Sequence, residues 1–344
     1  MDNRITKRRL SDFLSYEWIL MIVAIVAAIV VWELAYTIGS VRLSVGQQFK
    51  FYYDESIDGY TEDDFYSVLV GKNTFSYDVL ELNSESLTSD YNVLSVRLSI
   101  QEGDILITDK VAPKDDAEGD ELYIRAKSMV DSYSIYTLEG MLSDARTYLR
   151  DNFFTDAAKG KELSAINFSD LSQLDDAKIR AVFLDRMSKD NRFRSAEQKE
   201  EGFLLEKGRI QKLMQEVHAF GYFMDNAPEE CFFNYTKYEQ SHELEDAESD
   251  NKEVYYNLKQ REIDAGRENA KYGINVEFLK DSDTSSGEQK KDPSAYFKVK
   301  GNSDAKDVVM MAFNFREYQP HLQFETISFM NTVIRQCSDI IDNV

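Results

Sequence analysis

The chain has 344 residues, and its 62 Asp and Glu side chains outnumber its 40 Lys and Arg side chains, which gives a formal net charge of −22. An acidic surface of this size is repelled by phosphate backbones, so a nucleic acid is not an expected partner. Hydrophobic residues make up 43% of the sequence, an ordinary share for a folded chain long enough for one large or two moderate domains.

The most apolar stretch covers residues 18–38, with the sequence WILMIVAIVAAIVVWELAYTI. At about 1.5 Å per residue it extends over roughly 30 Å, the thickness of the hydrocarbon core of a bilayer. It therefore predicts a transmembrane helix that binds the lipid bilayer and keeps the protein at the cell membrane as a single-pass protein. The alternative is a cleaved signal peptide, but the residues after Trp32 make a poor cleavage site.

The charges before this stretch predict its orientation. Residues 1–17 form a basic juxtamembrane segment that contains Arg4, Lys7, Arg8 and Arg9. Segments rich in Lys and Arg stay on the cytoplasmic side of a membrane. We therefore expect a cytoplasmic N-terminus and an extracellular domain that contains most of the chain.

The first part of this domain gives strand and helix signals in alternation. Residues 48–53 are rich in β-formers and predict a first strand, which ends at the polar side chains of Asp54 and Glu55. Residues 61–70 predict a short helix with acidic residues in its first turn, and residues 76–82 predict a second strand.

The next stretch gives two conflicting signals. Alternate residues from Leu94 to Ile100 are apolar, which indicates a strand. Tyr91, Leu94 and Leu98 have helical spacing, however, and Gly103 can end a helix. We expect the helix, because it connects parallel strands on its two sides.

A compact apolar run at residues 105–108 predicts a third, buried strand, and helical signals dominate after it. Three stretches carry an apolar face at helical spacing: residues 138–154, 174–187 and 195–225. Strand signals are scarce in this part of the chain, and residues 231–239 are the best candidate. The middle of the chain is therefore expected to be mostly helical.

Five stretches of this chain resemble the first lobe of extracellular solute-binding proteins of the type II periplasmic class: FKFYYDES, YDVLELN, IQEGDILITD, YGINVEF and DVVMMAFNFREYQPH. The stretch RRLSDFLSYEWILM is similar to the juxtamembrane start of membrane-anchored relatives in Gram-positive bacteria. The resemblance implies non-covalent binding of a small-molecule ligand, with an ABC transporter permease or another membrane protein as the partner.

The resemblance and the order of elements together predict an α/β lobe with a mainly parallel sheet, of the type II periplasmic-binding kind. We expect residues 41–111 and 265–344 to form this lobe, with a closing helix at residues 324–341. Residues 112–264 depart from the family, which has a second α/β lobe there, and predict a mostly helical second lobe.

No motif with catalytic chemistry occurs in the sequence, whether a phosphate-binding glycine loop, HExxH, CxxC or GxSxG. We therefore expect no enzyme activity, no catalytic residue, no cofactor and no metal site. The two cysteines, Cys231 and Cys337, leave one disulfide open. Because Cys337 falls on the apolar stripe of the closing helix, two buried thiols are the expectation.

A ligand site in such a lobe is expected where parallel strands end, at their carboxyl side. The candidate ligand-binding residues follow the first, the third and the returning strand: Asp54, Glu55, Asp109, Asn314, Arg316 and Tyr318. Ordinary polarity of surface loops is the alternative explanation for these side chains.

Two functions remain open at this point. The first is a solute-binding-like protein that works by non-covalent binding, accessory to an ABC transporter. The second is a structural or assembly subunit of a membrane complex that has kept the fold, has lost the small-molecule ligand and uses its helical part as a protein interface.

Overall fold

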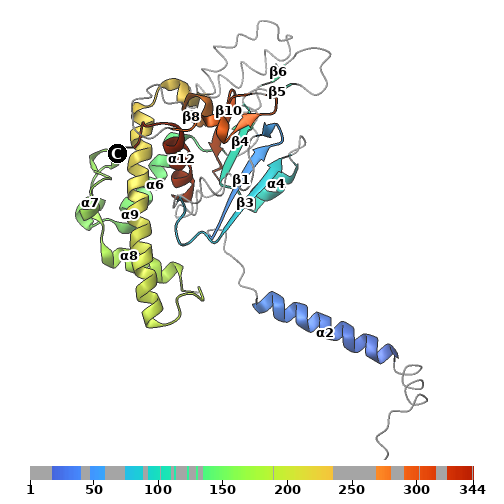
Figure 1. The fold of residues 1–344 in the computed structure, drawn as a ribbon. Coiled ribbons are helices and arrows are strands. Elements are labelled where there is room, and N and C mark those ends of the chain that lie inside the picture. Colours follow the sequence, from blue (N-terminus) through green and yellow to red (C-terminus); the bar gives the residue numbers. More distant parts are fainter. Residues whose placement is uncertain are drawn as a thin grey trace, which may run out of the picture. The chain divides into compact units, whose positions relative to one another are not determined.

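The structure is a computed structural model of the chain. It describes residues 18–39, 47–58, 74–87, 92–100, 102–109, 112–113, 122–123, 129–130, 135–188, 190–234, 269–279, 290–301, 303–314, 324–342 and 344. Residues Met1–Ser44 and Val45–Val344 form two separate units (Figure 1).

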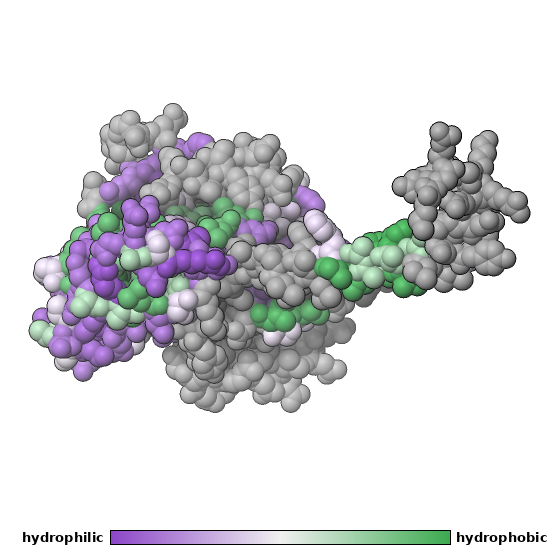
Figure 2. Space-filling model, turned by 90° about the horizontal axis from the view of Figure 1, so that it is seen from below, coloured by the Kyte–Doolittle hydropathy of each residue, from purple (hydrophilic) through white to green (hydrophobic). Residues whose placement is uncertain are grey.

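Helix α2 (Trp18–Gly39) is the described part of the N-terminal unit. Its side chains at residues 21–33 are exposed and nearly all apolar (Figure 2). Among the described residues, no helix combines the length and the hydropathy that a membrane crossing requires.

The prediction of a transmembrane helix at residues 18–38 is therefore wrong. The same finding contradicts a single-pass protein of the cell membrane with a cytoplasmic N-terminus and an extracellular domain. The basic segment of residues 1–17 lies outside the described residues.

A six-stranded sheet forms the centre of the second unit, in the order β3-β1-β4-β10-β8-β7. Its strands are β1 (Gln48–Asp54), β3 (Glu81–Leu87), β4 (Ile105–Asp109), β7 (Phe232–Asn234), β8 (Lys271–Asn275) and β10 (Val308–Ala312). Two small ribbons pair β2 (Ile57–Asp58) with β9 (Lys298–Val299), and β5 (Ala112–Pro113) with β6 (Leu122–Tyr123).

The sheet is mixed, so the predicted mainly parallel sheet is wrong. Strand β1 runs parallel to β3 and β4, as expected, but β10 runs antiparallel to both β4 and β8, and β7 runs antiparallel to β8. Antiparallel neighbours need no helical crossover between them. Strands β8 and β10, which follow the helical part of the chain, were expected to run parallel to β1 and β4. Local sequence patterns do not encode the direction in which a strand pairs.

The ambiguous stretch before the third strand forms a helix, α4 (Asn92–Ser99), as predicted. The first and third strands are also confirmed at β1 and β4. The second strand was predicted at residues 76–82 but begins at Glu81, because Tyr77 and Asp78 turn into the protein and bond to the helices there. The short helix predicted at residues 61–70 lies outside the described residues.

A layer of helices covers one face of the sheet (Figure 1). This helical layer comprises α6 (Leu138–Phe153), α7 (Asp156–Lys159), α8 (Asp176–Arg186), α9 (Ala196–Asn226) and α12 (Phe324–Cys337). Short 3-10 turns connect the main elements: Leu163–Ala165, Leu171–Gln173, Glu229–Cys231, Val276–Leu279 and Pro293–Ala295. Helix α9 begins with a capping box, in which the Ser195 hydroxyl accepts from Gln198 N and the Gln198 side chain accepts from Ser195 N.

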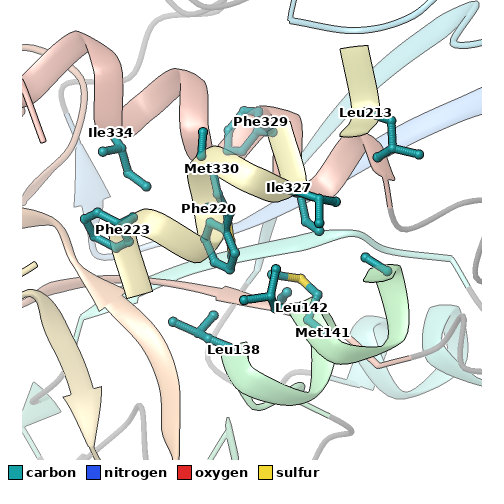
Figure 3. Close-up of a cluster of buried hydrophobic side chains, with 14 of the residues drawn as sticks. Leu138, Met141, Leu142, Leu213, Phe220, Phe223, Ile327, Phe329, Met330 and Ile334 are labelled. Atoms are coloured by element: carbon teal, nitrogen blue, oxygen red, sulfur yellow. The ribbon is translucent and has the colours of Figure 1, made fainter. Parts of the chain in front are cut away.

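The helical layer and the sheet share one hydrophobic core. Figure 3 shows side chains of α6, α9 and α12 that point toward one another, among them Leu142, Phe220 and Met330. On the sheet side, the rings of Phe49 and Phe51 lie 5.3 and 6.3 Å from the ring of Phe329 on α12. Helices α6, α8 and α9 therefore pack onto the sheet directly. The predicted domain boundaries near residues 112 and 264 stay predictions.

The opposite face of the sheet is covered by α4 and buries a second, smaller cluster, which includes Tyr52, Leu94 and Met311. Neighbouring residues of β10 alternate between the two clusters, as the pleat of a strand requires: Met310 belongs to the first and Met311 to the second. Cys231 and Cys337 are both buried, unbridged thiols, which confirms the prediction for the cysteines.

Candidate functional site

Three of the predicted ligand-binding residues lie at one edge of the sheet. Because β1 and β4 are parallel and Tyr53 pairs with Ile107, their carboxyl ends lie next to each other. This places Asp54 beside Thr108, the residue before Asp109 at the end of β4, so the pleat directs the two aspartates to opposite faces of the sheet. Both are buried, with exposed fractions of 1% and 3%. Asp54 Oδ1 accepts from the backbone N–H of Ser56 at 2.9 Å, whereas Glu55 is exposed.

Asn314 lies at the other edge, which differs from the prediction. In the antiparallel pair of β10 and β4, Val308 pairs with Asp109 and Ala312 pairs with Ile105. The chain therefore leaves β10 at the amino end of β4, the length of a five-residue strand, roughly 17 Å, from Asp109. Arg316 and Tyr318 lie outside the described residues. Ligand-binding residues are expected at the carboxyl ends of parallel strands, and this expectation does not apply to β10, which is antiparallel to β4.

A buried network of charges, which the sequence did not predict, is centred on Glu206 of α9. The Glu206 side chain is fully buried, with 0% exposed. Its Oε2 accepts from the Tyr77 hydroxyl at 2.8 Å, from Arg186 Nη2 at 2.6 Å and from Arg209 Nε at 2.9 Å, and its Oε1 accepts from Arg209 Nη2 at 2.9 Å. Burial favours the neutral carboxyl, but the Arg209 guanidinium and then Arg186 and Tyr77 outweigh it and lower the pKa of Glu206 to about 2.

The network continues through Asp78, which is 5% exposed. Asp78 pairs with Arg186 on one side and with Arg192 on the other, and Arg192 also pairs with Asp190 at 2.9 Å. Three carboxylates and three guanidinium groups, counting Glu206 and Arg209, therefore neutralise one another. This balance ties the segment before β3 to α8 and α9, and it is a structural clamp rather than a binding site.

One feature of the sequence does indicate this clamp. Glu206 and Arg209 lie three residues apart on the inward face of α9, where the neighbouring inward residues are apolar, such as Ile210 and Leu213. A charged pair on an apolar helix face indicates a buried ion pair. The partners of that pair, Tyr77 and Arg186, come from distant parts of the chain and give no local signal.

The described thiols have no features of a nucleophile or a metal ligand. Burial raises the pKa of Cys231 to about 11 and that of Cys337 to about 12, so both are protonated at neutral pH. In the described part of the chain, no group of three His, Cys, Asp or Glu side chains is placed to hold a metal ion.

The outward face of α9 is the most unusual surface of the described chain. A line of six residues, which we call the α9 line, faces solvent wholly or in part and carries no Asp, Glu, Lys or Arg: Leu204, Gly208, Gln211, Gln215, His218 and Tyr222. Leu204 and Tyr222, at its two ends, are 61% and 43% exposed. The spacing alternates between four and three residues, which is the spacing of the contact line between two helices packed side by side.

Helix α9 presents this line from a fixed position. Asn331 Nδ2 on α12 donates to Glu216 Oε2 at 2.7 Å and to the Glu216 backbone carbonyl at 2.8 Å, and Arg335 Nη1 donates to both Glu216 carboxylate oxygens at 2.9 Å. Together with the clamp at Glu206, these bonds hold the helix at two places along its inward side. A surface that is rigid before binding loses less conformational entropy when a partner docks.

No protein-family model, curated protein or solved structure matches the chain. The resemblance to solute-binding proteins therefore stays a prediction, and the candidate sites are the carboxylate edge at Asp54 and Asp109 and the α9 line.

Proposed function

We propose that the chain is a non-catalytic binding protein that holds another protein against the outward face of its helical layer. The observation that carries this proposal is the α9 line, an uncharged line along the longest described helix of a chain in which 30% of the residues are charged. Charged residues are depleted at the centres of protein interfaces, while Tyr is enriched there.

The charges on either side of the line support this function. Glu201, Lys207 and Asp225 flank the line on the same helix, and Lys207 is paired with Asp176 at 2.6 Å. An uncharged centre with a charged rim is the usual arrangement of a specific protein contact. An ordinary solvated helix face has no reason to exclude charge from one line only.

A second candidate function is binding of a small polar solute at the carboxylate edge, in the service of a transporter. The observation that favours it is the burial of Asp54 and Asp109, two carboxylates at the carboxyl ends of neighbouring parallel strands. Ligands of open α/β sheets bind at such ends. The helical layer, however, shares its core with the sheet, so among the described residues there is no separate lobe to close over this edge.

Photo-crosslinking tests the first function. A photoreactive amino acid replaces Gln215 in the full-length chain, expressed in cells that naturally contain it. The matched control replaces Val96, which is 63% exposed on α4 at the other face of the sheet. We expect a discrete crosslinked product with one protein from position 215 and none from position 96. Equal products from both positions, or none from either, would contradict the proposal.

Thermal shift tests the second function. A ligand that binds only the native state raises the melting temperature by mass action. The full-length chain is heated with sugars, amino acids, peptides and divalent cations in turn. A rise that disappears in Asp109→Asn would support solute binding, and no rise with any compound would remove this candidate.

A further inference from the structure

Arg146 of α6 occupies an uncommon position beside α9. Its guanidinium lies so close to α9 that a Cβ added to Gly221 would overlap with Nη2, and Leu142 borders the same glycine. The Cζ atom of Arg146 lies 5.4 Å from the centre of the Phe168 ring. Because Gly221 has no side chain, the guanidinium fits between the backbone of α9 and the Phe168 ring. We call this position, bordered by Gly221, Leu142 and Phe168, the seat of Arg146.

Within the described part of the chain, this guanidinium has no hydrogen-bonded acceptor. Arg146 Nε is buried and unpartnered, and no described carboxylate lies within ion-pair distance of the side chain. Burial lowers the pKa of Arg146, and the charge of Asp225 only partly opposes that effect. A partly buried cation without a hydrogen-bonded carboxylate is costly, although the chain has 62 acidic side chains that could have supplied one.

Arg180 shows how the same chain completes such a site elsewhere. Its Cζ lies 3.9 Å from the centre of the Phe203 ring, so it too rests on an aromatic face. Unlike Arg146, it donates from Nη1 and Nη2 to the two oxygens of Glu200, at 2.6 and 2.8 Å. What Arg146 lacks, compared with Arg180, is the carboxylate.

We propose that Arg146 is the docking point for a carboxylate that the protein partner supplies, an inference that rests on the proposed function. Gly221 directly precedes Tyr222, the last residue of the α9 line, so the guanidinium of Arg146 lies next to one end of that line. The planar guanidinium matches a carboxylate in a two-pronged contact. Asp225, which acts on Arg146 from the next turn of α9, disfavours a doubly charged phosphate.

The first arm of the test uses a free carboxylate as the probe. Full-length chain with ¹⁵N-labelled arginine is titrated with sodium acetate and, as the control, with sodium chloride at equal ionic strength. We expect a saturable shift of the Arg146 Nε–Hε signal with acetate only, and no shift of Arg180, whose carboxylate is already in place. The signals are assigned by their loss in Arg146→Lys and Arg180→Lys. Asp225→Asn is expected to tighten acetate binding about threefold, the effect of one unit charge across a solvated gap.

The wild-type titration needs no variant to fold, and Arg180 serves as its internal control. Gly221→Ala is expected to abolish the acetate shift, because the added Cβ displaces the guanidinium from its seat. Equal shifts of Arg146 and Arg180, or equal effects of acetate and chloride, would overturn the inference.

The second arm identifies the source of the carboxylate and separates this inference from the proposed function. The crosslinking experiment at position 215 is repeated with Arg146→Gln, and we expect the yield to fall at least tenfold. The matched control, Arg180→Gln, is expected to keep the yield. If the product forms and Arg146→Gln leaves it unchanged, the proposed function stands and the docking role of Arg146 is refuted, even when acetate binds.

Discussion

Replacement of Glu206 by Gln tests the buried clamp between the segment before β3 and the helical layer. Gln keeps the shape of the side chain but removes the charge that faces Arg209 and Arg186. Removing one partner of a buried ion pair costs about 3–5 kcal/mol, because the other charges stay buried without compensation. A domain has a total stability of about 5–15 kcal/mol, so the variant should be severely destabilised.

The depressed pKa of Glu206 agrees with this magnitude. Its value falls from 4.5 to about 2 on folding. A difference of about 2.5 units, at 1.36 kcal/mol per unit, amounts to about 3 kcal/mol of stability. Since the folded pKa is depressed, this contribution is complete above pH 4.5 and is lost as the pH falls toward 2. The stability difference between the wild type and Glu206→Gln should therefore shrink across that interval.

Urea unfolding of the full-length chain, followed by circular dichroism, measures both effects. Glu200→Gln is the matched control, since it removes the same charge from the exposed pair with Arg180. We expect the control to unfold almost at the wild-type urea concentration, because solvent screens exposed pairs. If Glu206→Gln unfolds at the same urea concentration as the control, or if its deficit does not change between pH 6 and pH 2, the clamp does not stabilise the fold.

Three further predictions concern the helices and the thiols. Gly202→Ala should destabilise the chain by about 1–3 kcal/mol in urea unfolding, because the new Cβ would collide with the Phe193 ring. The matched control is Gly208→Ala: the space around Gly208 is open, so this change should stabilise the chain by up to about 1 kcal/mol. Ser195→Ala should cost about 1 kcal/mol in the same assay, through loss of the α9 cap, and Ser195→Asp should restore most of it. The two cysteines should stay unlabelled by a thiol reagent in the native protein and react in denaturant, whereas fast labelling of the native protein would show that they are not buried.

The sequence predicts well those features that neighbouring residues determine. The inward face of α6 is the clearest case, since its buried residues are the ones that helical spacing singled out: Leu138, Met141, Leu142, Ala145, Leu149 and Phe153. Helix α4 was also predicted, although its period was ambiguous, because a helix connects the parallel strands on its two sides and Gly103 can end it. Both predictions rest on residues that are close in the sequence.

Features that depend on distant partners were missed or misjudged. Nothing near β10 reveals that it pairs antiparallel with β4, so Asn314 was placed at the wrong edge of the sheet. Glu206 is paired with Tyr77, 129 residues away, and the second strand was misplaced because Tyr77 and Asp78 serve this clamp instead of the sheet. The membrane prediction is contradicted by a different finding: no described helix has the length and the hydropathy of a membrane span.

A crosslinking scan along α9 tests the central claim, that its outward face binds a protein. The photoreactive amino acid is placed in the full-length chain at each position from 204 to 222 that is not buried, and the yield of the partner product is measured at each. We expect high yield at the six positions of the α9 line and low yield at the flanking positions 205, 207 and 212, so that the profile follows the alternating spacing of four and three residues. A flat profile, or one that peaks at the flanking positions, would contradict the claim.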